Sequence, residues 1–174
     1  MTGKIYFTKE NKDAIIPSKN DEDSGYDIYA CGYDEIELLP GDIKMIKTGI
    51  RTAFSQDYSM LVRERGSTGS KGLGVRAGVI DSGFRGEIKI VLNNTTNKTI
   101  ILSQDVNKTK KELQKGMSDP TYVETNYNIY PLSKGIAQLV VVKIPRLEVE
   151  ELPKEELLNI KSERGEGMLG STDK

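Results

Sequence analysis

AGVIDSGFRGEIKIVLNN, residues 77–94, combines a strand pattern with a single carboxylate at a turn. Its second half, GEIKIVL, alternates apolar and polar residues, which is typical of a β-strand with one face in the core and the other in solvent. In its first half an apolar run ends at Asp81, and a Ser-Gly pair and an aromatic residue, Phe84, follow. This arrangement is either an ordinary strand end or a base held beside a flat organic ring.

The strand character extends through most of the 174 residues. Short runs rich in β-branched and aromatic residues alternate with turns that contain Gly, Pro, Asn or Asp. Strands are expected at 4–9, 26–30, 35–40, 43–54, 58–64, 86–94 and 136–144. This spacing predicts an all-β fold of the sandwich, jelly-roll or barrel type. The nearly continuous apolar run QLVVVKI (138–144) predicts a strand buried on both faces or lying at a subunit interface.

Two segments depart from the strand pattern. Residues 103–116 carry helix signals, with Ser103 as the expected N-cap and Gly116 as the expected stop. This helix belongs to an insert at about 100–130, which is either a solvated surface loop or a partner-binding arm. Residues 151–162 predict a short helical linker, which leads into a Gly-rich tail. We therefore expect one β domain over 1–150 and a linker with a flexible arm over 151–174.

The charge and the apolar pattern argue against two classes of partner. The formal net charge is −1, so no overall basic field points to nucleic acid. No apolar run approaches the roughly 18 residues needed to span a bilayer, and the first residues lack the apolar core of a signal peptide. Cys31 is the single cysteine, which excludes an internal disulfide and fits a reducing cytoplasm.

The sequence contains no histidine, and this absence narrows the possible chemistry. It removes Ser-His-Asp and Cys-His nucleophilic schemes, His-ligated zinc and a His general base. Any acid–base chemistry must then come from carboxylates, Lys or Tyr. A hard cation such as Mg²⁺, bound through oxygen atoms, remains possible.

Four further motifs carry groups that can bind an anion or a metal. DSGYDIYA (23–30) places Asp27 at the start of a strand, and RERGSTGSKGL (63–73) places two arginines beside small and hydroxyl residues. Backbone N–H groups, hydroxyls and a guanidinium are the donors that bind phosphate. RGEGMLGST (164–172) has a similar composition, and KGIAQLVV (134–141) sets the amide of Gln138 in an apolar strand. Each motif alone also fits a turn, a surface loop or a packed strand.

Taken together and in this order, the five motifs resemble those of the homotrimeric dUTPase family, the deoxyuridine triphosphate nucleotidohydrolases. The resemblance spans residues 23–172 apart from the insert, and the 77–94 motif is the most specific. It implies a jelly-roll-like β-barrel in a threefold trimer, with active sites at subunit interfaces. It also implies Mg²⁺-dependent hydrolysis of dUTP to dUMP and pyrophosphate, which limits uracil incorporation into DNA.

The resemblance also assigns roles to residues. Asp81 is expected to activate the attacking water, and Asp27 to lie near Mg²⁺, through water. Phe84, where the family usually has Tyr, would lie under the deoxyribose and leave no room for the 2′-hydroxyl of a ribose. The phosphates would be held by residues of the second, fourth and fifth motifs: Arg65, Gly66, Ser67, Gln138, Arg164, Gly170, Ser171 and Thr172. The base would meet the backbone at Ala77, Gly78 and Val79 and the side chain of Leu169, where the family usually has Phe.

The insert exceeds the usual connection between the third and fourth motifs. Among similar proteins, phage members with such an insert bind a repressor, so residues 101–128 are a possible protein-binding surface. Two alternatives to a dUTPase therefore stay open: a regulatory binding protein and, within the same fold, a dCTP deaminase. In each case we expect a cytoplasmic protein, in the host cytoplasm if a phage encodes it.

Overall fold

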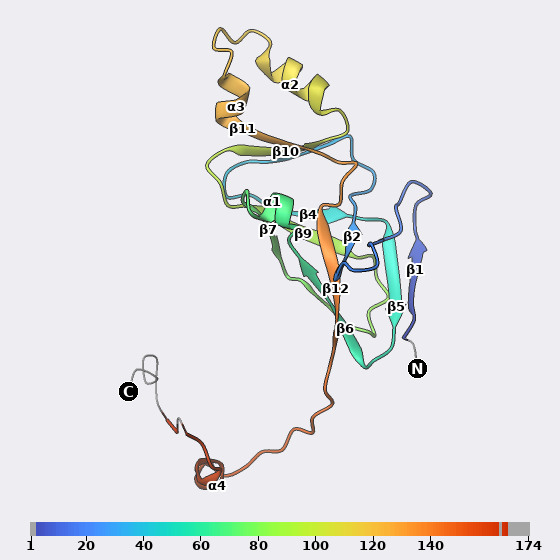
Figure 1. Cartoon of the computed structure of the whole chain (residues 1–174), viewed down its shortest axis with the longest axis vertical. Helices are drawn as coiled ribbons and strands as arrows, with labels where there is room; N and C mark the ends of the chain where they lie inside the picture. The colour runs from blue at the N-terminus through green and yellow to red at the C-terminus, as the bar shows by residue number, and fades with distance from the viewer. Residues whose placement is uncertain (1–2, 164, 167–174) are drawn as a thin grey trace. The chain divides into compact units, whose positions relative to one another are not determined.

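The computed structural model describes residues 3–163, 165 and 166. The chain divides into two compact units, residues 1–144 and 145–174. The strands are β1 (Ile5–Lys9), β2 (Gly25–Ile28), β3 (Glu35–Leu38), β4 (Ile43–Lys47), β5 (Ile50–Phe54), β6 (Tyr58–Arg63), β7 (Leu73–Arg76), β8 (Val79–Ile80), β9 (Lys89–Asn94), β10 (Thr99–Ser103), β11 (Tyr127–Pro131) and β12 (Ala137–Lys143) (Figure 1). The helices are α1 (Gly66–Gly69), α2 (Val106–Gln114), α3 (Tyr122–Asn126) and α4 (Lys154–Asn159).

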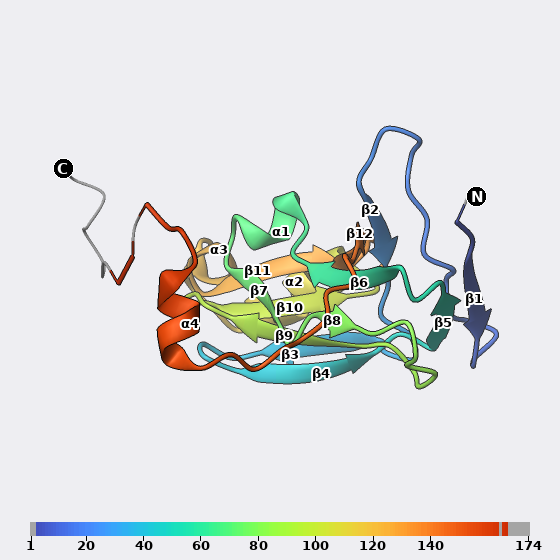
Figure 2. The ribbon, with the colours of Figure 1, turned by 90° about the horizontal axis from the view of Figure 1, so that it is seen from below.

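The strands of the first unit form four sheets, with the orders β1-β5, β11-β10-β3, β2-β12-β6-β8 and β4-β9-β7. Every paired neighbour is antiparallel except β10 and β11. Figure 2 shows the strands from a second direction. The prediction of an all-β, jelly-roll-like fold is confirmed. The barrel is not closed by hydrogen bonds, however, because the ladders among the described residues stay in four separate sheets.

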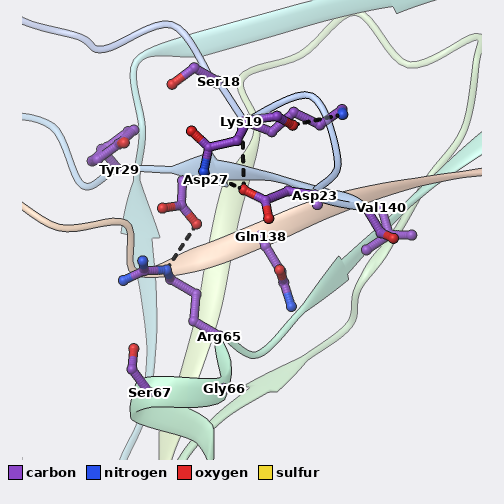
Figure 3. A pocket seen from close by; sticks show the side chains of 13 residues that line it. Ser18, Lys19, Asp23, Asp27, Tyr29, Arg65, Gly66, Ser67, Gln138 and Val140 are labelled. Carbon is purple, nitrogen blue, oxygen red and sulfur yellow. Dashed lines mark hydrogen bonds and ion pairs between the residues drawn. The ribbon is translucent and has the colours of Figure 1, made fainter.

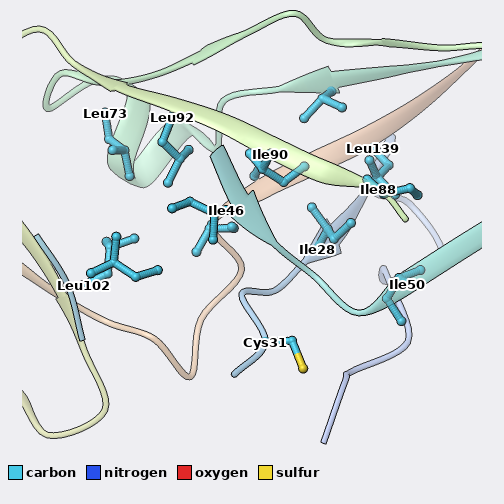
Figure 4. Close-up of a cluster of buried hydrophobic side chains, with 14 of the residues drawn as sticks. Ile28, Cys31, Ile46, Ile50, Leu73, Ile88, Ile90, Leu92, Leu102 and Leu139 are labelled. Carbon is cyan, nitrogen blue, oxygen red and sulfur yellow. The ribbon is translucent and has the colours of Figure 1, made fainter. Parts of the chain in front are cut away.

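The core follows the alternation seen in the sequence. Ile88, Ile90 and Leu92 are fully buried, whereas Lys89 between them is exposed. The three buried side chains pack with residues such as Ile28 and Leu139 in one hydrophobic cluster (Figure 4). Burial of these side chains supplies most of the driving force for the fold, at about 1.5–3 kcal/mol for each.

The expected strand 43–54 is two strands, because the chain turns at Gly49. Gly49 has φ +65°, and a Cβ there would lie 2.9 Å from the Cβ of Ala14. Only glycine fits both the left-handed backbone and the close packing. Four strands, β7, β8, β10 and β11, were not predicted from the sequence, and neither were α1 and α3.

The insert forms a crossover between β10 and β11. These strands are parallel neighbours, so the chain has to return along the length of β10, and α2 and α3 make this connection (Figure 1). Helix α2 begins later than predicted, with Asp105 as its N-cap accepting a hydrogen bond from the N–H of Lys108. The predicted cap, Ser103, instead ends β10, and its Oγ lies 2.8 Å from Oγ1 of Thr109.

The second unit contains α4, which confirms the helix predicted after Pro153. Every described residue from Pro145 to Glu163 is exposed, including Leu147, Val149 and Leu157. The helix therefore buries no core of its own.

Candidate functional site

A hollow of about 630 Å³ lies beside β2, β12 and the segment that follows β6. It brings together Asp27, Arg65, Gly66, Ser67 and Gln138, which the sequence placed in three different motifs (Figure 3). We call it the phosphate hollow.

Strand pairing explains this grouping. In the antiparallel ladder of β12 with β2, Gln138 is opposite Asp27, and in the ladder with β6 it is opposite Arg63. Directly paired residues share a face of the sheet, so the side chains of Asp27 and Gln138 lie on the same side. Arg65 follows β6 by two residues, and α1 begins next to it.

Arg65, in the second motif, bonds both to the first motif and to the loop before β12. Its Nε donates to Oδ1 of Asp27 at 2.9 Å, and its Nη1 donates to the carbonyl of Gly135 at 3.2 Å. The guanidinium has five N–H donors, so these two bonds leave others for a bound anion. A Cβ at Gly135 would lie 3.0 Å from Cβ and Cγ of Asp27, so this ion pair depends on a small residue there.

An amide within an apolar strand is expected either to bridge the backbone or to face a ligand. Gln138 lines the hollow, and its Nε2 donates to the backbone carbonyl of Glu64 at 2.7 Å. The carboxylate of Glu64 in turn accepts a hydrogen bond from the N–H of Val75. Hydrogen bonds from its own backbone N–H and from that of Val75 lower the pKa of Glu64, so it stays charged. These contacts tie β7 and β12 to the segment that carries Arg65.

Sequence reasoning missed part of the lining of the phosphate hollow. Ser18, Lys19, Asp23 and Tyr29 also line it. Ser18 reaches the site because its carbonyl accepts the N–H of Asp27 in an isolated β-bridge. No local pattern marks a bridge of this kind. Asp23 and Tyr29 lie within the first motif and could have been included.

A second hollow, of about 600 Å³, gathers the third motif. Ala77, Val79, Asp81 and Phe84 line it, together with apolar residues such as Met45. Asp81 is exposed and lies in a turn that its own carbonyl closes by accepting the N–H of Phe84 at 3.0 Å. Phe84 is 45% exposed, and its ring lies so close to Gly86 that an added Cβ there would be 2.5 Å from Cζ of the ring. We call this the base hollow.

The backbone before Asp81 is held in an unusual shape. Ala77 has φ +51°, the one positive value among the described non-glycine residues. The carbonyl of Gly78 accepts the N–H of Val62 at 2.7 Å, and a Cβ at Gly78 would lie 2.6 Å from the Val62 carbonyl. Strained backbone of this kind is common where a main chain is positioned for a ligand.

The predicted site residues thus form two groups in one chain. The phosphate and base hollows have no lining residue in common. Arg164, Leu169, Gly170, Ser171 and Thr172 lie outside the described residues. Within the described residues, no group of three or more carboxylate or cysteine side chains forms a metal site. None of the helices in the described part of the chain has the length and apolar character of a membrane span.

Comparison with known proteins decides the family. The dUTPase family model matches residues 11–106, more than half of the chain. The chain belongs to the dUTPase family. The deoxyuridine 5'-triphosphate nucleotidohydrolase of Nautilia profundicola is 30% identical over 98% of this chain and 99% of its own length.

Solved dUTPases share the fold. A mutant dUTPase of Staphylococcus bacteriophage 80alpha with dUpNHpp matches with TM-score 0.71 and 22% identity over 97% of this chain and 98% of its own. The phage phi11 dUTPase, described as showing a species-specific insert, matches with TM-score 0.62 and 23% identity over 86% and 96%. The chain also matches the Pol polyprotein of caprine arthritis encephalitis virus, at 29% identity over 58% of this chain, but spans only 9% of that protein's length. The predicted resemblance to phage-type dUTPases is confirmed.

Proposed function

We propose that this protein is a dUTP diphosphatase, which hydrolyses dUTP to dUMP and pyrophosphate and thereby limits the incorporation of uracil into DNA. Membership of the dUTPase family supports the reaction. The observation that carries the assignment is the grouping of Arg65, Ser67, Gln138 and Asp27 around one hollow. Cationic, hydroxyl and amide donors of this kind match the oxygens of a triphosphate.

The phosphate chain would lie in the phosphate hollow. Arg65 would donate its remaining N–H groups to phosphate oxygens, because two of its donors already fix its position against Asp27 and Gly135. Gln138 would donate the second hydrogen of its amide nitrogen, and the small residue Gly66 would let the backbone approach. Ser67 would add a hydroxyl donor.

Asp81 would act as the base. Its carboxylate would take a proton from a water molecule while the water oxygen bonds to the α-phosphorus and the bond to the bridging oxygen of pyrophosphate breaks. Asp81 is exposed and lines the base hollow, where water can reach it.

The family is generally Mg²⁺-dependent, and a solved phage phi11 dUTPase mutant is described as revealing the coordination of a structural Mg(II) ion. In this chain the phosphate hollow offers oxygen donors, which suit Mg²⁺, but Asp27 is already paired with Arg65. The residues therefore fit a metal held mainly by the triphosphate and water, with Asp27 contacting its water shell. When bound, Mg²⁺ would neutralise charge on the phosphate oxygens.

The uracil would meet the backbone of Ala77, Gly78 and Val79, and the deoxyribose would lie on the ring of Phe84. Main-chain donors and acceptors distinguish uracil from cytosine, because the two bases present reversed hydrogen-bond groups. The tight contact of Gly78 with Val62 fixes this backbone in place.

The separation of the two hollows supports a homotrimer whose sites form between subunits, one supplying the phosphate hollow and its neighbour the base hollow. The second unit offers exposed apolar side chains, such as Leu157 and Leu158, that would be buried against another subunit. Residues 1–150 would then be the catalytic domain. The arm at 151–174 would bring Arg164, Leu169, Gly170, Ser171 and Thr172 over a neighbouring site.

Nucleotide specificity tests the function. With Mg²⁺, pyrophosphate release is expected from dUTP and not from UTP, dTTP or dCTP, and chelation of Mg²⁺ should stop it. Phe84→Ala should narrow the preference for dUTP over UTP by roughly tenfold or more, since the ring no longer crowds a 2′-hydroxyl. Phe84→Tyr is the matched control and should keep the preference. Ammonia release from dCTP without dUTP hydrolysis would instead identify a dCTP deaminase.

A second function, binding of a protein partner such as a repressor, is favoured by the insert. Helix α2 exposes three lysines, Lys108, Lys110 and Lys111, against one acidic residue, Glu112. The related phage 80alpha dUTPase is described as controlling the transfer of virulence genes. We propose residues 101–128 as the contact surface, with α2 at its centre.

Because α2 and α3 form a crossover, a simple deletion of 101–128 would also cut β10 and β11. Replacing residues 106–126 by a flexible linker of about ten residues keeps both strands connected. We expect turnover of dUTP within about twofold of the unmodified protein, since no residue of 106–126 lines either hollow. Steady-state kinetics measure the turnover, and light scattering measures the oligomeric state. Loss of both turnover and the trimer would show that the insert is structural.

The single cysteine supports a cytoplasmic location for this enzyme. Cys31 is buried, and burial raises the pKa of its thiol, so the unreactive protonated form is favoured. A chain with one cysteine cannot form an internal disulfide, which agrees with a reducing compartment.

A further inference from the structure

A third cavity, of about 130 Å³, lies between α1 and β11. Arg65, Ser67 and Thr68 line it from the second motif, and Tyr130 lines it from the strand that follows the insert. Arg65 and Ser67 also line the phosphate hollow, so the two spaces have a wall in common. No role assigned above involves Thr68 or Tyr130.

Two of the residues that line this cavity carry a buried hydroxyl group without a hydrogen-bond partner within the described part of the chain. The two atoms are Oγ1 of Thr68 and the phenolic oxygen of Tyr130. Thr68 as a whole is only 8% exposed. A buried polar group without a partner costs about 1–3 kcal/mol, so native proteins rarely keep one without a ligand or water. Two such groups on residues that line one small cavity favour a polar occupant that both could reach.

The charge of the lining favours an anion. Arg65, Lys71 and Lys134 line the cavity, and no Asp or Glu does. Nζ of Lys71 lies 5.9 Å from the centre of the Tyr130 ring, which places its positive charge beside the phenol. Burial raises the pKa of Tyr130, so its hydroxyl stays protonated and can donate near neutral pH. Every charged side chain on the cavity is therefore cationic, and both unpartnered groups can donate.

We propose that this cavity binds a small phosphate-type oxyanion, with the hydroxyls of Thr68 and Tyr130 as donors and Lys71 and Lys134 as counter-charges. A space of about 130 Å³ holds several water molecules or one such anion. The anion is either free orthophosphate or pyrophosphate released at the adjacent phosphate hollow. Naming pyrophosphate rests on the proposed function, whereas binding of orthophosphate does not depend on hydrolysis.

The proposal is tested by calorimetric titration of orthophosphate and pyrophosphate at constant ionic strength, with chloride as the reference anion. Thr68→Val and Tyr130→Phe remove one hydroxyl each and almost no volume. Each is expected to weaken anion binding about tenfold, while the KM for dUTP stays within twofold. Tyr6→Phe, which removes an exposed hydroxyl from β1, is the matched control and should bind as the unmodified protein does.

Competition separates this cavity from the phosphate hollow. With a non-hydrolysable dUTP analogue at saturation, orthophosphate should still bind, because the cavity lies on the other side of the wall formed by Arg65 and Ser67. Binding that the analogue abolishes and that both variants retain would place the anion in the phosphate hollow and overturn the proposal. A loss of stability in both variants without any anion dependence would show that the cavity holds water, which also overturns it. Selective binding of pyrophosphate would identify the reaction product as the source.

Discussion

Asp81→Asn is expected to reduce the turnover of dUTP by roughly 100- to 10,000-fold, the usual contribution of a positioned general base. The amide keeps the size of the carboxylate but cannot accept a proton from water. The side chain is exposed in a turn, and the turn is closed by the backbone carbonyl, so the fold should be unaffected. The KM for dUTP should change little, because Asp81 is proposed to act on the attacking water and not to hold the phosphates or the base.

Asp34→Asn is the matched control, since Asp34 is an exposed aspartate that lines neither hollow. It should keep full turnover. Pyrophosphate release measures the rates, and thermal unfolding checks that both variants fold. Full activity in Asp81→Asn would rule out this carboxylate as the base.

Truncation after Ser162 is expected to lower kcat/KM for dUTP by about 100-fold or more, the scale of effect when substrate positioning is lost. This change removes Arg164, Leu169, Gly170, Ser171 and Thr172, the residues proposed to close over the nucleotide. The free energy of unfolding should change by less than about 1 kcal/mol, because the described residues around the cut, such as Glu163, are exposed and leave no cavity in the core.

Truncation after Gly170 is an informative comparison, because it keeps Arg164 and Leu169 and removes only Ser171, Thr172 and the last two residues. An intermediate loss of activity would divide the contribution between the two ends of the arm. A lower kcat/KM with an unchanged unfolding midpoint would indicate a missing lid, whereas a lower midpoint would indicate a weakened fold. Unchanged kinetics after Ser162 would show that the arm has no part in catalysis.

The elements that the sequence predicted well are those whose pattern is local. Ile88, Ile90 and Leu92 alternate with exposed or half-buried residues, so the strand and its buried face followed from the sequence alone. Pro153 likewise marked the start of α4. Strands β10 and β11 were missed, because their pairing joins Thr99 to Tyr127 across the insert and no local pattern encodes such a register.

The residues of the candidate site were also named from the sequence, where the order of the five motifs identifies the family. How these residues group in space was not predicted from the sequence. The ladder that sets Asp27 opposite Gln138, and the separation of Asp81 from Arg65 into different hollows, depend on which strands become neighbours. Ser18 enters the phosphate hollow only through a single bridge to Asp27.

The sequence by itself determined the all-β class and the absence of histidine chemistry, and it named Asp81 as the candidate base, because composition, alternation and motif order are properties of the linear chain. Only the tertiary structure decided that the insert is a crossover between parallel strands, and that Thr68 and Tyr130 meet at one cavity. These two residues are far apart in the sequence, and they line the same cavity only after the chain has passed through the insert. Contacts of this range are set by strand pairing and burial, which no short segment specifies.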